Sequence, residues 1–418
     1  MSATSSSLIE TPPRPESELP ALFAKVQTYG MIAAGLGLVL LLVAGFLTSW
    51  TEVWRGYLIA YFFWFGLSMG SLGIVFLYHL AGGRWGFIVR RPMEAGAVAL
   101  VAMLVMFLPI VGLVLTSNPA VYVWLDPAKI ASDPIIAAKG WYLNPGAWSS
   151  RALLALIVFI GFAFALRQSS LRQDSAPDGD FSLASRMRQL SGLGVLFYVV
   201  LMTMIAVDWA MSIEPHWFSA IYGVLFIVGQ GLSVFAFIIV MVSVLVRFQP
   251  FASIINKDRL DEYGKLMLAF VVLWAYVNYG QYIIIWSGNI HEFTPWYLNR
   301  LGEGWIVLSV FLMLFHFAVP FALLLSRLLK RNLRLLTLVA GWILFVRLLE
   351  IFWLIAPDFV NSFGSPLIAL IMTYIAAHIL LGGVWFMAFG WVLQRQPVLP
   401  ANDLRNDPRA MKGQVAHA

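Results

Sequence analysis

The stretch DWAMSIEPHWFSAIYG, residues 208–223, separates two apolar halves of the chain. Pro215 stops a helix and Trp favours the headgroup level of a bilayer, so Trp209 and Trp217 predict a short turn at a membrane surface. Five apolar segments precede this turn and five follow it. The central turn therefore predicts a chain that crosses a membrane ten times.

Three ionisable residues lie in this stretch: Asp208, Glu214 and His216. Such groups beside hydrocarbon are costly and call for an explanation. Two explanations fit the pattern. One is an interfacial hairpin that contacts water and headgroups, and the other is a mouth where protons are exchanged.

The composition is that of a membrane protein. Of 418 residues, 61% are hydrophobic and 11% are charged, whereas a soluble domain has roughly 25% charged residues. Each apolar segment has about 20 or more residues, enough to cross ~30 Å of hydrocarbon, and continuous apolar runs exclude a strand barrel. The predicted spans are 29–49, 56–80, 93–116, 149–167, 188–211, 218–246, 264–287, 303–329, 333–356 and 367–393. We therefore predict an all-α, polytopic membrane protein.

The chain has no cysteine. This excludes disulfides, thiolate-held iron–sulfur clusters and covalent haem c within it. The sequence has no phosphate loop, HExxH or G-x-S-x-G motif, and no span carries two histidines for a pair of bis-histidine haems. We therefore expect no cofactor or metal in this chain. Any metal or redox centre must use His, Met or carboxylate ligands, or must lie in a partner.

The net charge of +6 is distributed unevenly among the loops. Basic residues gather in alternate loops, and the opposite loops hold few, mainly Arg55, Lys129, Lys139, Arg151 and Arg300. This positive-inside pattern predicts that both termini are cytoplasmic. We expect a cytoplasmic tail over 1–28, at least partly disordered, a membrane domain over 29–393, a second cytoplasmic tail over 394–418, and no cleavable signal peptide.

Four ionisable residues are predicted to lie deepest in the membrane: His316, Arg347, Glu350 and His378. Arg347 and Glu350 are three apart and share a helix face. A charge at the bilayer centre costs about 2.5–3.5 kcal/mol on insertion scales, and a pair reduces that cost without removing it. The pattern fits a buried ion pair that joins two helices, and it equally fits proton or quinone chemistry.

Other spans carry patterns of packing. In the second span Gly66 and Gly70 predict close helix approach, and Glu94 is expected in the first turn of the third span, where it suits the helix dipole. The seventh span has a polar and aromatic stripe, which predicts contact with protein, a water-filled gap or a quinone ring rather than with lipid. Its residues are Trp274, Asn278 and Gln281 on one face and Tyr279, Tyr282 and Trp286 on the next.

Four blocks of sequence together resemble one family, the second NrfD-like membrane subunit of alternative complex III. The blocks are GWYLNPGAWSSRALL (140–154), DWAMSIEPHWFSAIYGVLFIVGQGLS (208–233), NYGQYIIIWSGNIHEFTPWYLNR (278–300) and LFHFAVPFALLLSRLLKRN (314–332). With the ten spans, the resemblance covers nearly the whole chain outside the tails.

The resemblance implies a quinol:electron-acceptor oxidoreductase in a bacterial cytoplasmic membrane, with menaquinol or another quinol as substrate of the complex. It implies transfer of electrons to a c-type cytochrome or blue copper protein. The implied partners are a sister NrfD-like subunit, an iron–sulfur subunit and multihaem cytochrome c subunits, which hold the haem c and iron–sulfur clusters. It also implies two four-helix bundles with flanking helices.

For this chain we expect an anchoring role and a transmembrane proton path, with Asp208 and Glu214 as its outer exit. The path residues are Asp208, Glu214, His216, His316, Arg347, Glu350 and His378. Spans two to five and six to nine both start outside, so we predict two bundles related by a parallel repeat. Outer loops 117–148 and 288–302 are expected to contact another subunit. Alternatives are an independent secondary transporter, a quinone-binding subunit and a haem b carrier.

Overall fold

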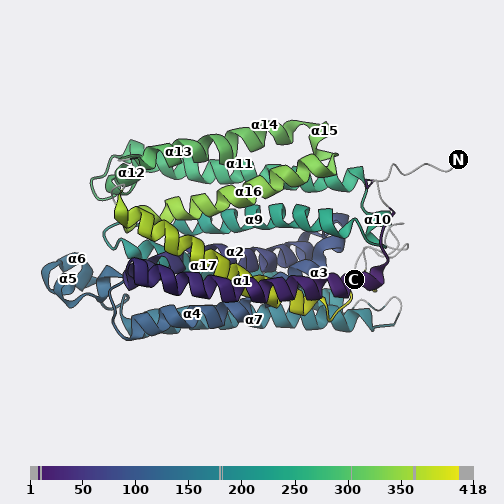
Figure 1. The fold of residues 1–418 in the computed structure, drawn as a ribbon, viewed down its shortest axis with the longest axis horizontal. Coiled ribbons are helices and arrows are strands. Elements are labelled where there is room, and N and C mark those ends of the chain that lie inside the picture. Colours follow the sequence, from purple (N-terminus) through teal and green to yellow (C-terminus); the bar gives the residue numbers. More distant parts are fainter. Residues whose placement is uncertain are drawn as a thin grey trace.

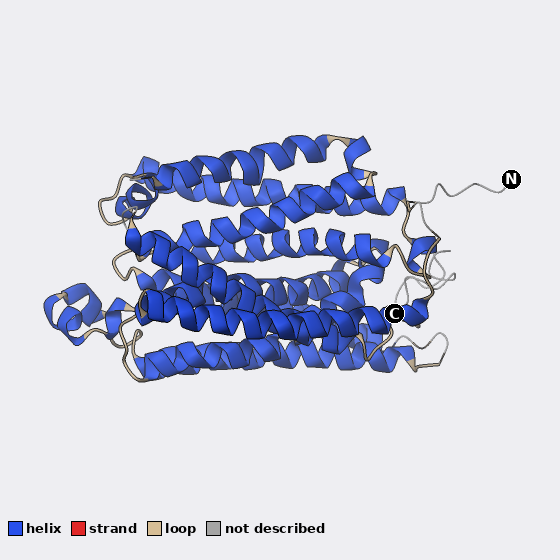
Figure 2. Ribbon diagram, in the orientation of Figure 1, coloured by secondary structure: helices blue, strands red, loops and turns tan. Residues whose placement is uncertain are grey.

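The computed structural model describes residues 8–9, 12–177, 180, 182–302, 304–360 and 364–403. The regular elements of this part of the chain are helices (Figure 2). Ten helical segments within it are long and apolar enough to cross a membrane. This confirms the prediction of an all-α protein with ten spans.

The spans in chain order combine one to three elements each. They are α1 (Leu19–Leu47), α2 (Trp50–Ala81), α3 and α4 (Arg84–Val98, Leu100–Leu115), α7 (Pro145–Asp174), α8, η3 and η4 (Ser182–Ile205, Ala206–Ala210, Met211–Ile213), α9 (Tyr222–Leu245), α11 (Lys257–Gly288), α13, η5 and α14 (Trp305–Leu312, Met313–Ala318, Val319–Leu325), α16 and η6 (Leu333–Ile355, Ala356–Asp358) and α17 (Ser365–Leu393). The short helices are η1 (Glu16–Glu18), η2 (Val123–Leu125), α5 (Pro127–Ser132), α6 (Pro134–Ala138), α10 (Phe251–Ile254), α12 (Thr294–Leu301) and α15 (Arg327–Lys330).

Several helices begin before the apolar segment that predicts them, because a polar first turn is capped. The Asn144 side chain accepts a hydrogen bond from the amide of Ala147 at 2.9 Å, and Pro145 occupies the first helical position. Asn256 caps α11 in the same way. Such caps satisfy amides that have no partner within the helix. Hydrophobicity therefore marks the membrane core of a span, and the cap marks its start.

The tails differ from the expected boundaries. Helix α1 begins at Leu19, so residues 19–28 are helical and do not form a tail. At the other end, Gln396 accepts a hydrogen bond from Arg167 at 3.1 Å. Residues 396–403 therefore contact the membrane domain, and residues 404–418 lie outside the described part of the chain.

The third span also starts earlier than predicted. Helix α3 begins at Arg84 and meets α4 at Ala99, so Glu94 lies in the third turn and not in the first. Its side chain is buried and paired with arginines, so the expected role in the helix dipole is wrong.

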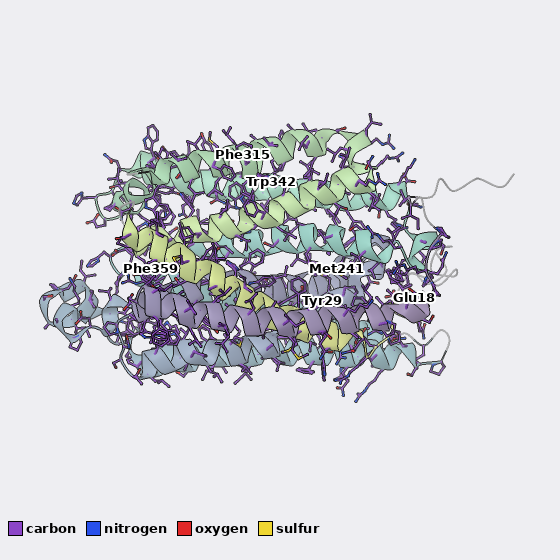
Figure 3. All side chains as sticks on the ribbon, in the orientation of Figure 1. Glu18, Tyr29, Met241, Phe315, Trp342 and Phe359 are labelled. Carbon is purple, nitrogen blue, oxygen red and sulfur yellow. The ribbon has the colours of Figure 1, made fainter. Side chains whose placement is uncertain are left out.

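The helices lie side by side along the long axis of the molecule (Figure 1). Helices α5 and α6 project beyond one end, which we call the loop end. Glu18 lies at the opposite, terminal end, whereas Phe359 lies at the loop end (Figure 3). Helix α1 runs along α17 at a distance that only small residues allow, since a Cβ at Gly383 would meet the backbone of Gly30 and Ala34.

Two helices form the interior. In the most apolar window of α2, 89% of residues are buried, and in α9 83% are, against 17% in the span Trp305–Leu325. The glycine face predicted in the second span is confirmed at Gly70, where a Cβ would lie 2.6 Å from the carbonyl oxygen of Gln230 on α9. Large apolar side chains on the peripheral helices, such as Val307 and Leu338, are exposed on the outer surface, as expected for a membrane protein.

Most of the remaining helices fall into two groups, according to whether they pack on the side of α2 or of α9. Helices α3, α4, α7 and α8 pack with α2 and with one another, and we call this set the first helix group. Helices α11, α13, α14 and α16 pack with α9 or with one another, and we call these with α9 the second helix group. The predicted parallel repeat of two bundles remains a prediction.

Candidate functional site

Asp208 lies in the end of a helix and not in the central turn. Helix α8 continues through the π-helical η3 and the short η4 to Ile213. The Asp208 side chain is 1% exposed, and its carboxylate accepts hydrogen bonds from Arg151 Nε at 2.8 Å and Nη2 at 3.2 Å. A bidentate arginine compensates a buried carboxylate well. The prediction that places Asp208 in an interfacial turn is wrong.

The two tryptophans that flank the turn are buried. Trp209 stacks on Phe107 with ring centroids 4.1 Å apart, and Trp217 stacks on Trp296 at 4.6 Å. Trp209 therefore packs against α4, and Trp217, which lies in the turn, packs against α12. They do not form the headgroup-level pair that the sequence predicts.

The other two charged residues of the turn lie at the surface. His216 Nδ1 is 2.8 Å from Glu214 Oε1, and His216 Nε2 is 2.6 Å from Asp133 Oδ2. Burial lowers the pKa of His216, but the hydrogen bonds and charges of Glu214 and Asp133 outweigh it and raise that pKa above its usual value. Lys139 Nζ donates to the Pro215 carbonyl oxygen. These contacts tie the turn to the long loop 117–148.

A second group of ionisable residues lies inside the second helix group. Arg347 and Glu350 form an ion pair on α16 and are 2% and 0% exposed. Trp274 Nε1 on α11 donates to Glu350 Oε1 at 2.7 Å, and Arg347 Nε donates to Ser233 Oγ on α9 at 3.2 Å. The pair therefore joins three helices, as its predicted helical face allows.

A glycine on α9 makes room for this arginine. A Cβ at Gly229 would lie 2.6 Å from Arg347 Cζ, which is well inside van der Waals contact. Ser233 is one turn further along the same face. A glycine and a serine four residues apart thus shape the seat of the guanidinium group.

His316 completes this group. It lies in the π-helical turn η5, and its ring packs at a tilt of 40° against Trp274 with centroids 4.1 Å apart. Pro320 follows four residues later and has no amide to donate to the His316 carbonyl, which explains the local change of helix type. His316 is 0% exposed, and among the described residues neither ring nitrogen has a hydrogen-bond partner. We call Trp274, His316, Arg347 and Glu350 the buried acid–base cluster.

His378 lies apart from this cluster. Its Nδ1 accepts a hydrogen bond from Trp64 Nε1 on α2 at 3.1 Å, and Tyr374 packs edge-on against its ring at 4.3 Å. The Tyr374 hydroxyl donates to the Leu348 carbonyl oxygen on α16 at 2.7 Å. One tyrosine therefore separates His378 from the helix that carries the Arg347–Glu350 pair.

No protein-family model matches the chain, and no curated protein matches it. The candidate site is therefore defined by its own geometry. Within the described residues, no group of three or more His, Asp or Glu side chains is placed to hold a metal ion.

The stripe of the seventh span divides between two environments. Trp274 and Gln281 are buried, and Ser219 Oγ donates to Gln281 Oε1 at 3.2 Å. Tyr279 and Trp286 are 65% and 67% exposed on this chain. The expectation of protein contact is correct for Trp274 and Gln281 on the first face. Within this chain it is wrong for Tyr279 and Trp286 on the second face.

A charged cluster at the terminal end escapes prediction from the sequence. Glu94 pairs with both Arg90 and Arg91 at 2.9 Å. Asp403 accepts from Arg90 Nη1 at 2.7 Å, and Asp174 pairs with Arg91. We call these five residues the terminal-end cluster. Its arginines look like ordinary loop residues in the sequence, and the only signal is a Glu three and four positions after them.

Arg300 and Asp358 also escape prediction. Arg300, expected in an outer loop, is 0% exposed and donates to Asp358 Oδ2 at 2.9 Å. Its guanidinium lies over the Trp296 ring at 3.4 Å from the centroid. The partners are 58 residues apart, and no sequence spacing connects them.

Proposed function

We propose that this chain is an integral membrane subunit of a quinol:electron-acceptor oxidoreductase of the alternative complex III kind. In this proposal it anchors the complex, provides a transmembrane proton path and carries no redox centre of its own. The four sequence blocks that resemble the family and the absence of cysteine support this assignment.

The buried acid–base cluster is the observation that carries the proton-path part of the proposal. Burying a carboxylate, a guanidinium and an imidazole in the membrane interior is expensive, and such groups mark proton relays. Glu350 is the exchangeable carboxylate, and Arg347 holds the local charge. His316 passes protons on, because an imidazole can accept a proton at one ring nitrogen and donate one from the other. Trp274 contacts both Glu350 and His316 and positions them.

The assembly part of the proposal rests on the surface of the loop end. Ile135 and Trp141 in the loop 117–148 are 50% and 81% exposed, and α5 and α6 project from the bundle (Figure 1). An exposed Trp outside the membrane core suits a contact with a companion subunit. We place the loop end outside a bacterial cytoplasmic membrane and both termini in the cytoplasm, from the positive-inside pattern.

The proposal is tested in two steps. A tagged chain should co-purify with multihaem and iron–sulfur subunits. If it purifies alone and catalyses substrate-coupled transport, it is a transporter and the proposal is wrong. The reconstituted complex then allows the ratio of protons moved to electrons transferred to be measured.

Glu350→Gln should lower this ratio and leave quinol oxidation largely intact, because only the exchangeable proton is removed. Glu262→Gln is the matched control, since Glu262 lies on a peripheral helix, pairs with Arg259 and is 43% exposed. An unchanged ratio in an intact Glu350→Gln complex would show that Arg347 and Glu350 only join helices.

A further inference from the structure

A polar cavity of about 230 Å³ lies at the loop end. One of its lining residues, Phe359, is labelled at the loop end in Figure 3. A cavity of this size has room for several waters. Its principal lining residues are Arg55, Val121, Val123, Asp126, Asp358 and Phe359.

The charged walls of the cavity are held in fixed positions. Arg55 Nε donates to the Ala120 carbonyl oxygen at 3.0 Å, and its Nη1 pairs with Glu52 at 2.9 Å. Asp126 caps α5 by accepting from the Ala128 amide at 2.9 Å. Fixed charges of both signs on one small cavity favour water over lipid inside it.

Asp358 lies between this cavity and a buried arginine. Arg300 donates to Asp358 from Nη2 at 2.9 Å, and the same nitrogen donates to the Leu354 carbonyl oxygen at 2.7 Å. Among the described residues, Arg300 Nε has no hydrogen-bond partner. A buried guanidinium N–H is costly to leave unsatisfied, so this group is a natural donor to water.

The same span links Asp358 to the buried acid–base cluster. Glu350 and Leu354 are four residues apart on one face of α16, and Asp358 ends the 3₁₀ turn η6 that follows it. With ~1.5 Å of rise per residue, Asp358 is roughly 12 Å along the axis from Glu350. Arg300 contacts the backbone at Leu354, midway between them.

We infer that this cavity is a water-filled chamber through which the buried acid–base cluster exchanges protons with the loop-end side, and that Asp358 is its terminal carboxylate. This inference rests on the proposed function. A proton leaves the Glu350 carboxyl group, moves along hydrogen-bonded waters to the Asp358 carboxylate, and passes from there to water of the cavity. The ion pair with Arg300 holds the acceptor in place.

The inference replaces the expected exit through Asp208 and Glu214. Asp208 is buried in the first helix group and bound by Arg151, and Glu214 lies at the surface with His216. Asp358, by contrast, is in the same membrane span as Glu350 and lines a cavity.

The chamber is tested with single cysteines, because the chain has none. Val123→Cys places a thiol in the cavity, and Leu338→Cys places one on the lipid-facing side of α16, where Leu338 is 69% exposed. A charged, membrane-impermeant thiol reagent on the loop-end side should label Val123→Cys roughly tenfold faster, because the reactive thiolate forms in water and not in lipid. Equal labelling rates of the two variants would show that the cavity is not filled with water.

Asp358→Asn tests the terminal carboxylate in the reconstituted complex, with Glu262→Gln as the control outside the cavity. The ratio of protons to electrons should fall with Asp358→Asn and stay unchanged with Glu262→Gln. If Glu350→Gln lowers the ratio and Asp358→Asn does not, the inference is wrong and the proposed function stands. If neither variant lowers the ratio, the inference and the proton-path part of the proposed function are both wrong. If Asp358→Asn prevents assembly, the cysteine labelling decides.

Discussion

The terminal-end cluster and the buried acid–base cluster hold charge in opposite ways. In the first, each arginine meets two carboxylates, and Glu94 bridges both arginines. In the second, one arginine meets one carboxylate, and His316 lies beside them with no hydrogen-bond partner among the described residues. The first cluster lies at an end of the bundle and the second lies inside it.

The difference separates two uses of buried charge. A network in which each group is bound several times is rigid, and each proton has a fixed place. A cluster with few partners leaves room for a change of protonation. We therefore expect neutral substitutions to damage stability in the terminal-end cluster and proton transfer in the buried acid–base cluster.

The largest effect is expected for Glu94→Gln. It leaves Arg90 and Arg91 with one carboxylate each, in a site where all three side chains are at most 4% exposed. Removing one partner of a buried charge pair costs about 3–5 kcal/mol. Thermal unfolding in detergent should show a large loss of stability, whereas Glu262→Gln should unfold like the unsubstituted chain. If the two variants unfold at the same temperature, the terminal-end cluster does not stabilise the fold as we expect.

The sequence predicts the spans and the ionisable groups inside them, because hydrophobic length and intramembrane charge are local properties. The Arg347–Glu350 pair follows from a spacing of three on one helix. Gly70 follows from its spacing to Gly66. These features need no knowledge of neighbouring helices.

The partners across helices are not predictable in this way. Asp208 meets Arg151, Arg300 meets Asp358 and Arg90 meets Asp403 only because the fold joins distant segments. The position of Trp209 is not predictable for the same reason. It packs on the Phe107 ring and not at the headgroup level, because the fold brings that ring next to it.

The second effect is expected for Trp274→Phe. Phenylalanine keeps a ring beside His316 and removes the indole N–H that donates to Glu350. A hydrogen bond to a charged group contributes about 1.5–3 kcal/mol. Stability should fall by less than with Glu94→Gln, and the ratio of protons to electrons should fall as well. A loss of stability with an unchanged ratio would make Trp274 a packing residue alone.

The third effect is expected for Gly229→Ala. The added methyl group meets the Arg347 guanidinium and forces it from its seat. Overpacking costs typically about 1–3 kcal/mol. Gly112→Ala is the control, because a Cβ there meets nothing within 4 Å. If Gly229→Ala lowers the ratio of protons to electrons in a complex that still assembles, the position of Arg347 matters for proton transfer.

The smallest effect is expected where His216 contacts Glu214 and Asp133, a pair of contacts that we call the tie. It extends the comparison to a cluster exposed to solvent. The His216 and Glu214 side chains are 45% and 39% exposed. Solvent screens such pairs, so they contribute little to stability. His216 also makes the pKa of Asp133 lower than usual, chiefly through a hydrogen bond.

The sign of the pH dependence follows from these two shifts. The raised pKa of His216 stabilises the tie fully below its unfolded pKa of about 6.5, and this is lost as pH rises through the folded pKa. The lowered pKa of Asp133 contributes above about 3.9 and is lost in strong acid. Protection of the Ile135 and Ile136 amides, which donate to Asp133, should therefore decrease modestly as pH rises above neutral. His216→Gln should abolish this dependence in hydrogen-exchange measurements. If protection still follows pH in that variant, a group other than His216 controls the tie.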